Sequence, residues 1–212
     1  LPMRPLTRDS LKKGAAALAR TDPALGRWIR LIGSLDFRPR PGRFHSLCRA
    51  IISQQLSAAA ARSIHGRFAS LFAPTKRPTP GKLLKIRPRR LKSCGLSEKK
   101  VLYLRELAKA FENGSLRRRR FASMENEEII ELLILLPGIG RWTAEMFLMF
   151  CLGRPDIFSM GDLALRAGIE RVAGRKLSDE EVLEKSRGWS PWRTVACLYL
   201  WKISHWKGEP GD

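Results

Sequence analysis

Between two apolar segments the chain reads Leu135-Leu136-Pro137-Gly138-Ile139-Gly140-Arg141-Trp142-Thr143-Ala144. Pro137 ends the preceding helix, and the two glycines permit backbone conformations that other residues rarely adopt, so the stretch predicts a tight turn between two helices. The exposed N–H groups of such a turn, with the positive end of the following helix, form a phosphate site that needs no contact with a base. The alternative interpretation is a helix–helix connection that binds nothing.

Apolar residues at three- and four-residue spacing extend on both sides of this turn. They predict helices over residues 24–34, 44–72, 98–112, 127–136, 141–152, 178–187 and 192–204. Breaks rich in proline and glycine separate them, at 38–42, 74–81, 87–88, 113–114, 137–140, 153–155 and 188–191. Because no stretch alternates like a strand, the expected fold class is all-α.

The charge balance points to a polyanionic partner. The chain has 40 Lys and Arg residues against 20 Asp and Glu residues, a formal net charge of +20, and nucleic acid is the first candidate. A membrane partner is disfavoured, because the sequence has neither a run of about 18 apolar residues nor a separate basic amphipathic helix. The basic patches that could neutralise phosphates are Arg38–Arg43, Lys82–Lys100, Arg117–Arg120 and Arg175-Lys176.

Cysteine and histidine give no pattern of a metal site. The cysteines at 48, 94, 151 and 197 are widely spread, which predicts reduced thiols rather than a zinc site or a disulfide scaffold. His45, His65 and His205 are isolated, so no ligand set for a divalent metal is expected. With no signal-peptide pattern at the N-terminus, the expected location is cytoplasmic and nucleoid-associated in a bacterium, or nuclear in a eukaryote.

From Leu136 to Ala144 the sequence resembles the helix-hairpin-helix of the HhH-GPD superfamily of DNA glycosylases. The glycine- and proline-rich loop of that superfamily has a counterpart in residues 153–162, which end at Asp162. The resemblance is widest with the 3-methyladenine DNA glycosylase II branch, from about Phe44 to Trp201. It implies the short all-helical form, with the active cleft between two lobes: residues 1–37 with 166–212, and residues 38–165 with the hairpin at about 127–152.

This resemblance implies a monofunctional glycosylase, monomeric, that flips alkylated purines such as 3-methyladenine or 7-methylguanine out of damaged duplex DNA and excises them hydrolytically. Asp162 would be the catalytic carboxylate, stabilising positive charge on the sugar; the structural alternative is a helix N-cap before Leu163. Strand-cleaving relatives carry a lysine where Trp142 stands, so no AP lyase activity is expected. Relatives with an iron–sulfur cluster have four clustered cysteines, whereas residues 192–212 hold only Cys197, so no cluster is expected.

The resemblance also implies a base-binding pocket and a DNA wedge. Trp142 and Trp192 match the aromatic lining of the alkylpurine branch, although both could be ordinary core tryptophans. Further candidates for the lining, each more often a core residue, are Phe44, Met146, Phe158, Met160 and Leu163. The wedge that fills the space of the extruded base would be Gln55 or Leu56, and the alternative for Gln55 is an amide bonded to nearby backbone.

At the hairpin, the resemblance implies phosphate contacts from Gly138, Gly140, Arg141 and Thr143. It also implies that no cofactor is required, although the backbone carbonyls of Ile134, Leu136 and Ile139 could hold a structural Na⁺ or K⁺. Two other functions stay open: a glycosylase for an oxidised or deaminated base, and a helix-hairpin-helix protein that binds DNA lesions without turnover.

Overall fold

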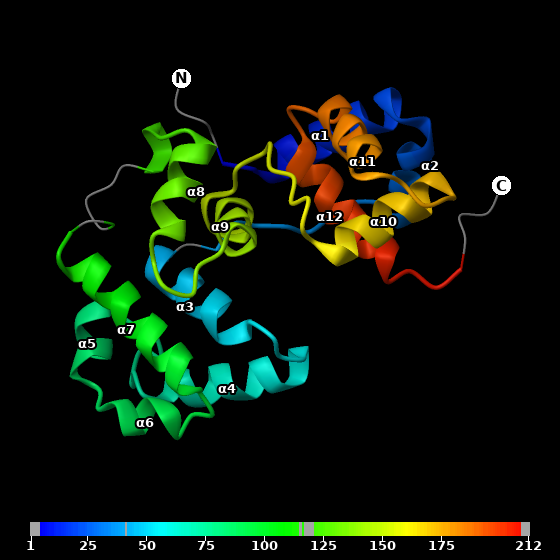
Figure 1. The fold of residues 1–212 in the computed structure, drawn as a ribbon. Helices are drawn as coiled ribbons and strands as arrows, with labels where there is room; N and C mark the ends of the chain where they lie inside the picture. The colour runs from blue at the N-terminus through cyan, green and yellow to red at the C-terminus, as the bar shows by residue number, and fades with distance from the viewer. Residues whose placement is uncertain (1–4, 41, 115, 117–120, 209–212) are drawn as a thin grey trace. The chain divides into compact units, whose positions relative to one another are not determined.

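Every regular element in the described part of the chain is helical (Figure 1). This computed structural model describes residues 5–40, 42–114, 116 and 121–208. Among them are twelve α-helices, one 3-10 turn and one π-helical turn, and none of these residues lies in a strand. The all-α fold class predicted from the sequence is therefore confirmed.

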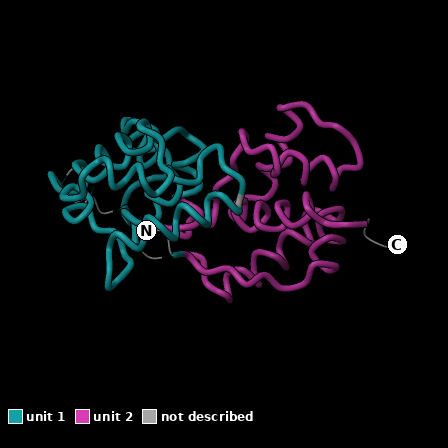
Figure 2. Tube along the Cα trace, turned by 90° about the horizontal axis from the view of Figure 1, so that it is seen from below, with its two compact units in different colours: residues 1–2, 40–147 teal, residues 3–39, 148–212 magenta. Residues whose placement is uncertain are grey.

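The chain forms two compact units (Figure 2). Of the described residues, the first unit contains those between 40 and 147, and the second joins 5–39 with 148–208. None of the helices among the described residues combines the length and the apolar character of a membrane span.

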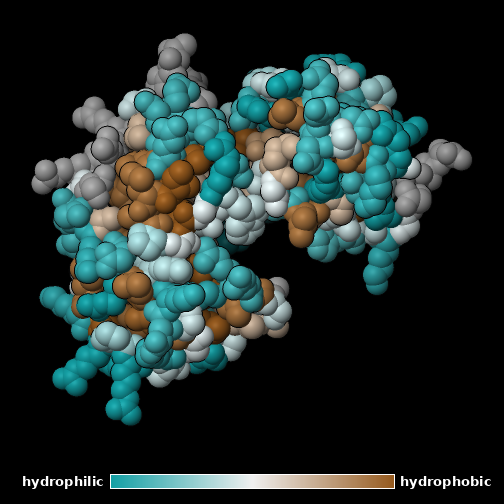
Figure 3. Space-filling view, viewed as in Figure 1, coloured by the Kyte–Doolittle hydropathy of each residue, from teal (hydrophilic) through white to brown (hydrophobic). Residues whose placement is uncertain are grey.

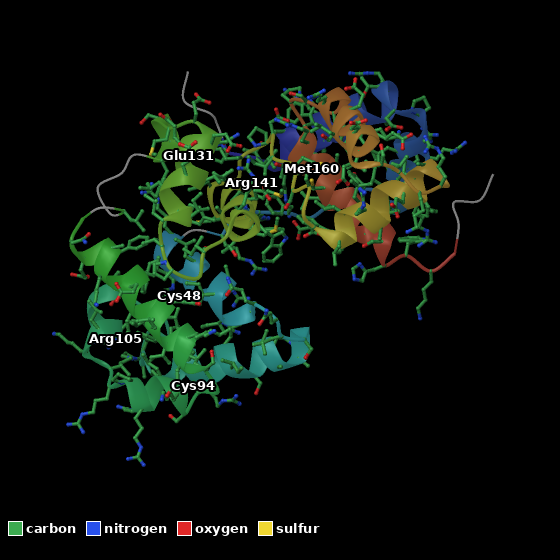
Figure 4. All side chains as sticks on the ribbon, viewed as in Figure 1. Cys48, Cys94, Arg105, Glu131, Arg141 and Met160 are labelled. Atoms are coloured by element: carbon green, nitrogen blue, oxygen red, sulfur yellow. The ribbon has the colours of Figure 1, made fainter. Side chains whose placement is uncertain are left out.

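The first unit is built around α3. Its elements are α3 (Arg43–Ser53), α4 (Ala58–Ser70), α5 (Pro80–Lys85), α6 (Pro88–Lys92), α7 (Glu98–Glu112), the 3-10 turn η1 (Phe121–Ser123), α8 (Asn126–Ile134) and α9 (Arg141–Phe147). Helix α3 packs against both α7 and α9 and buries Leu47, Ile51 and Ile52 completely. Arg105 of α7, labelled in Figure 4, donates to the carbonyls of Leu84 and Ile86 and so ties the end of α5 to α7.

The second unit is built around the pair α10 and α12. Its elements are α1 (Arg8–Thr21), α2 (Pro23–Ile32), the π-helical turn η2 (Leu148–Leu152), α10 (Leu163–Ala173), α11 (Asp179–Gly188) and α12 (Arg193–Ser204). A Cβ atom on Gly168 of α10 would lie 2.4 Å from the carbonyl oxygen of Leu200, so the two helices approach closely only because residue 168 has no side chain. Helix α1 packs on the same unit through Gly14, whose added Cβ would lie 2.9 Å from the ring of Trp192.

Several features of the helices differ from the sequence-based prediction, and helices α1 and α10 lie outside the predicted ranges. The proposed helix 44–72 is interrupted by the non-helical residues 54–57, where the chain turns before Ser57 caps α4. Pro80 and Pro88 lie in segments predicted as breaks, yet each begins a short helix, because the missing N–H of proline is no loss in the first helical turn.

The division of the chain also differs, by two residues at the first boundary and by 18 residues at the second. The lobes predicted from the sequence divide after residues 37 and 165, whereas the compact units divide after residues 39 and 147. Residues 148–165 group with α12 because the Thr194 hydroxyl donates to the Arg154 carbonyl at 2.7 Å and accepts from the Ile157 N–H at 3.0 Å. Leu6 adds a backbone hydrogen bond to Gly153 at 2.8 Å.

Candidate functional site

The turn between α8 and α9 is a tight hairpin. Leu135 is the C-cap of α8, and the N–H of Ile139 donates to the Leu136 carbonyl at 3.1 Å. Gly138 has a φ of 82°, and a Cβ atom there would lie 2.1 Å from the ring of Tyr103. The glycine is therefore required twice, by the left-handed backbone and by the close approach of the ring.

An open groove of about 850 Å³ runs along this hairpin. Its lining comes from the end of α3 and the loop after it, the start of α7, and the hairpin itself with Trp142. Leu135 is 78% exposed and Trp142 43% exposed, and hydrophobic side chains gather on the face of this unit over α8 (Figure 3). Exposed apolar side chains beside backbone N–H groups fit a partner that presents both apolar and anionic atoms.

Two neighbouring glutamines have different roles at the groove. The side-chain Nε2 of Gln54 donates to the Gly138 carbonyl at 2.8 Å and to Thr143 Oγ1 at 3.3 Å. Gln55 is exposed, with a φ of 55° that non-glycine residues adopt only at some cost in energy. Of the two wedge candidates, Gln55 is therefore exposed at the groove, and Leu56 beside it is half-buried.

Lys100 fixes the backbone of the same loop. Its Nζ donates to the carbonyls of Ile52 at 2.8 Å and Gln54 at 2.7 Å, and burial lowers its pKa. At the end of α3, the Oγ of Ser53 lies 3.0 Å from Nε2 of His65. Burial and neighbouring positive charges lower the pKa of His65 to about 4, so this ring is neutral near pH 7.

The side chains of two predicted phosphate ligands form contacts with other residues of the protein. Arg141 (Figure 4) begins α9, where its guanidinium contacts Glu127 at 2.5 Å and Glu145 at 3.1 Å. Thr143 is buried, and its hydroxyl accepts from Gln54. The groups of the hairpin best suited to an anion are therefore backbone N–H groups, with Gly140 exposed at the start of α9.

The three carbonyls predicted to hold a monovalent cation come from the end of α8 and the turn after it. The carbonyl of Leu136 accepts the Ile139 N–H, Ile139 is buried, and Ile134 is the last residue of α8. In the described residues, no group of three or more His, Cys, Asp or Glu side chains is arranged to hold a metal ion.

Asp162 lies in the second unit, as the N-cap of α10. Its Oδ1 accepts from the backbone N–H groups of Ala164 at 3.0 Å and Leu165 at 2.9 Å, and from Nε1 of Trp201 at 3.2 Å. The residue is only 8% exposed. The capping role predicted as the structural alternative is thus present, and the indole of α12 holds the carboxylate in addition.

The neighbouring carboxylate, Asp156, has a different function. It forms a two-point ion pair with Arg193 at 2.7 and 3.0 Å and accepts from Ser190 at 2.8 Å. Burial alone would raise the pKa of Asp156, but these hydrogen bonds hold it below its ordinary value of 3.8. Asp156 therefore fastens the loop before Asp162 to the start of α12.

The predicted pocket residues are divided between the two units. In the first unit, Trp142 is exposed at the groove, Met146 is buried in α9, and Phe44 packs edge to face on Phe111 with ring centroids 5.3 Å apart. Phe44 is therefore a core side chain of that unit.

In the second unit, Trp192 is half-buried against Gly14 and immediately precedes α12. Phe158 lies near Trp189, with ring centroids 6.0 Å apart. Leu163, at 82%, and Met160 (labelled in Figure 4), at 37%, are exposed and lie within two residues of Asp162 in the chain. Both flank the N-terminus of α10, where a ligand of the carboxylate would lie.

The basic patches differ in how much charge they leave for a partner. Arg175 pairs with Glu181 at 2.5 Å and Lys176 with Glu170 at 2.7 Å, so that pair is largely neutralised. Lys99, within the patch 82–100, is exposed and lines the groove. The run Arg117–Arg120 lies outside the described residues.

Two residues at these sites were not assigned a role by the sequence analysis. Gln54 was passed over for its neighbour, and Trp201, which stacks near Phe150 with centroids 5.5 Å apart, served only to mark the end of the resemblance. The double amide at 54–55 is the available signal for the first, although the sequence does not indicate which of the two side chains faces the protein. The bond from Trp201 to Asp162 spans 39 residues, and no local pattern indicates it.

Comparison with known proteins gives consistent matches. Residues 48–192 match the HhH-GPD superfamily base excision DNA repair protein family. The chain is 34% identical over 203 residues to DNA-3-methyladenine glycosylase 1 of Schizosaccharomyces pombe, covering 92% of this chain and 88% of that protein.

Solved structures extend this similarity. A DNA-3-methyladenine glycosidase from Bacillus halodurans has a TM-score of 0.81 at 34% identity, over 90% of this chain and 88% of that one. The 3-methyladenine DNA glycosylase of S. pombe, in complex with abasic DNA, has a TM-score of 0.76 at 33% identity, over 90% of this chain and 95% of that one.

Proposed function

Because this chain belongs to the HhH-GPD superfamily of base excision DNA repair proteins, we propose that it is a monofunctional DNA glycosylase that excises alkylated purines from duplex DNA. The substrate class is supported by the S. pombe and B. halodurans proteins, whose names describe action on 3-methyladenine. The single observation that carries the reaction is the carboxylate of Asp162, buried and fixed by three N–H donors at the start of α10.

The chemistry follows from the charge of the substrate. A purine alkylated at N3 or N7 is positively charged, and when the bond from C1′ to the base nitrogen breaks, the electron pair leaves with the base, which becomes neutral. The positive charge stays on the sugar. The fixed carboxylate of Asp162 stabilises this charge, water adds to C1′, and a proton passes from that water to the carboxylate or to solvent. The products are a free base and an abasic site.

The decisive experiment compares Asp162→Asn with Asp22→Asn. Asp22 is a matched control within the chain, because it is the N-cap of α2 and accepts from the Leu25 N–H and from the indole of Trp189, each at 3.0 Å. Asparagine caps helices well, so both variants keep a capping side chain and lose one charge. We expect release of methylated purines from methylated duplex DNA to fall about 100-fold or more in Asp162→Asn only. Equal rates in the two variants would contradict a catalytic role of Asp162.

We assign the DNA contacts to the hairpin groove. The backbone N–H groups of Gly138 and Gly140 would bind a phosphate, and the pairing of Arg141 with two carboxylates favours backbone over side chain for this role. Gln55 would fill the space of the extruded base, a role supported by its exposure. The carbonyls of Ile134, Leu136 and Ile139 would hold Na⁺ or K⁺ against that phosphate.

The extruded base would be recognised by aromatic faces. An electron-deficient base is attracted to the face of an indole, and the two candidates, Trp142 in the first unit and Trp192 in the second, are each only partly buried. Met160 and Leu163 would contact the reacting sugar, since both are exposed and lie within two residues of Asp162.

The same reaction would leave the DNA strand intact. Trp142 stands where strand-cleaving members of the superfamily place a lysine, and an indole cannot form a Schiff base with the sugar. We expect the reaction product to run as a full-length strand until alkali is added, and borohydride to trap no covalent complex. Cleavage without alkali would show that another amine of the chain acts as a nucleophile.

A further inference from the structure

One side chain joins the hairpin to the loop after α3. Nε2 of Gln54 bonds both to the carbonyl of Gly138 in the turn and to the hydroxyl of Thr143 in the first turn of α9. The two segments are 84 residues apart in the chain, and both line the groove. Because the amide is half-buried and donates twice within the protein, it serves the protein's own structure.

A second side chain fixes the other end of the same loop. Lys100 Nζ bonds the carbonyls of Ile52 and Gln54, where α3 ends at Ser53 and leaves carbonyls without helical partners. A cation at a helix C-terminus is favourable, since the helix dipole is negative there. Although Lys100 lies in a basic patch, its ammonium group is directed to these carbonyls.

Gln55, the next residue of the loop, has a backbone conformation that the surrounding structure must stabilise. Gln55 has a left-handed backbone conformation, with a φ of 55°, and conformations of this kind persist where the surrounding structure fixes them. The carbonyl of Gln54, which precedes it directly, is held by Lys100, and the side chain of Gln54 is held by the hairpin.

We propose that Gln54 and Lys100 are positioning residues that hold the loop 54–57 against the hairpin, so that phosphate binding and insertion of Gln55 occur in one fixed geometry. The effect on DNA binding rests on the proposed function, whereas the coupling of the two segments is a property of the protein without DNA. If the contacts of Gln54 and Lys100 are removed, the hairpin can still bind a phosphate, but the side chain of Gln55 is no longer held in position for insertion.

The test uses Gln54→Met, which keeps the length of the side chain and removes its donors, and Lys100→Met. The probes are an undamaged duplex and the same duplex with a tetrahydrofuran abasic-site analogue. We expect affinity for the undamaged duplex to change less than about twofold, and the preference for the abasic duplex to fall about tenfold, as expected for loss of one to two hydrogen bonds. Lys100→Arg should restore much of the preference.

Lys109→Met is the matched control for charge, because Lys109 lies on the same helix, pairs with Glu106 and is not part of the groove lining. It should leave the preference for the abasic duplex unchanged. Equal losses of affinity for both duplexes in Gln54→Met would overturn the proposal, since the hairpin itself would then have failed.

Hydrogen exchange in the free protein separates this proposal from the proposed function. Gln54→Met should raise amide exchange both in residues 53–57 and in residues 137–143, with the melting temperature of the remaining fold little changed. Unchanged exchange in 137–143 would overturn the coupling, whatever the enzyme does to DNA. If the wild-type protein releases no base, the proposed function fails, and the exchange result still decides whether the two segments are coupled.

Discussion

The carboxylate of Asp162 has an observed structural role as the N-cap of α10, and the proposed function gives it a chemical role as well. The N–H groups of α10 orient Oδ1 of Asp162 from one side, and the indole of Trp201 in α12 donates from another helix. Backbone capping alone would fix the residue to its own helix. The indole also fixes it relative to α12, which is what a group aimed at a reacting sugar requires.

Trp201→Phe tests this positioning. The phenyl ring keeps the aromatic contact with Phe150 and removes the N–H donor to Asp162. Since a hydrogen bond to a charged group is worth about 1.5–3 kcal/mol, we expect single-turnover base release to fall about 10- to 100-fold with little change in DNA affinity. Trp189→Phe removes the equivalent donor from Asp22 and should lower stability without this loss of rate. Comparable rates in the two variants would refute the positioning role.

The sequence predicts the role of a single residue only where a local pattern indicates it. The resemblance at residues 153–162 predicted a catalytic Asp162, which stays a prediction, and the geometry at α10 shows the capping role that was its structural alternative. The partner of Asp162 could not be predicted, because Trp201 follows 39 residues later and its indole is positioned by the packing of α12 on α10. The choice between Gln54 and Gln55 likewise depends on which amide meets Gly138 after folding.

At the scale of elements, the hairpin depends on one glycine more than on the other. Gly138 has a φ of 82° and an added Cβ would strike the ring of Tyr103, whereas an added Cβ on Gly140 meets no atom within 4 Å. We expect Gly138→Ala to lower the free energy of unfolding by about 1–3 kcal/mol, and Gly140→Ala to change it by less than about 0.5 kcal/mol. Urea denaturation measures both, and equal effects would contradict this account of the turn.

The helices show why some elements were predicted and others were not. Helix α7 has the predicted bounds, 98–112, because large apolar residues repeat along one face and Ser97 caps its start. Helix α1 was not predicted, since its buried face consists of Leu11, Gly14 and Leu18. In a sequence, glycine indicates the end of a helix. At position 14, however, the missing side chain leaves room for the ring of Trp192, and this contact exists only in the folded chain.

For the whole molecule, the net charge is +20, but the basic side chains differ in how freely they can contact a polyanion. Exposed lysines such as Lys176, which is paired with Glu170, add to the net charge but contribute little to binding a phosphate. Lys99 contributes to the total equally and is exposed in the hairpin groove. Affinity for DNA should therefore depend on where a positive charge lies and not on the sum alone.

Lys99→Gln and Lys176→Gln distinguish these possibilities, because each removes one charge from an exposed side chain. Each phosphate contact releases counterions, so the logarithm of affinity falls with the logarithm of salt concentration in proportion to the number of contacts. We expect Lys99→Gln to weaken binding to undamaged duplex DNA and to reduce the slope of the salt dependence by about 1. Lys176→Gln should keep the wild-type slope, because its charge is already matched by Glu170. If both variants reduce the slope equally, net charge governs binding and the hairpin groove is not the place where the phosphates lie.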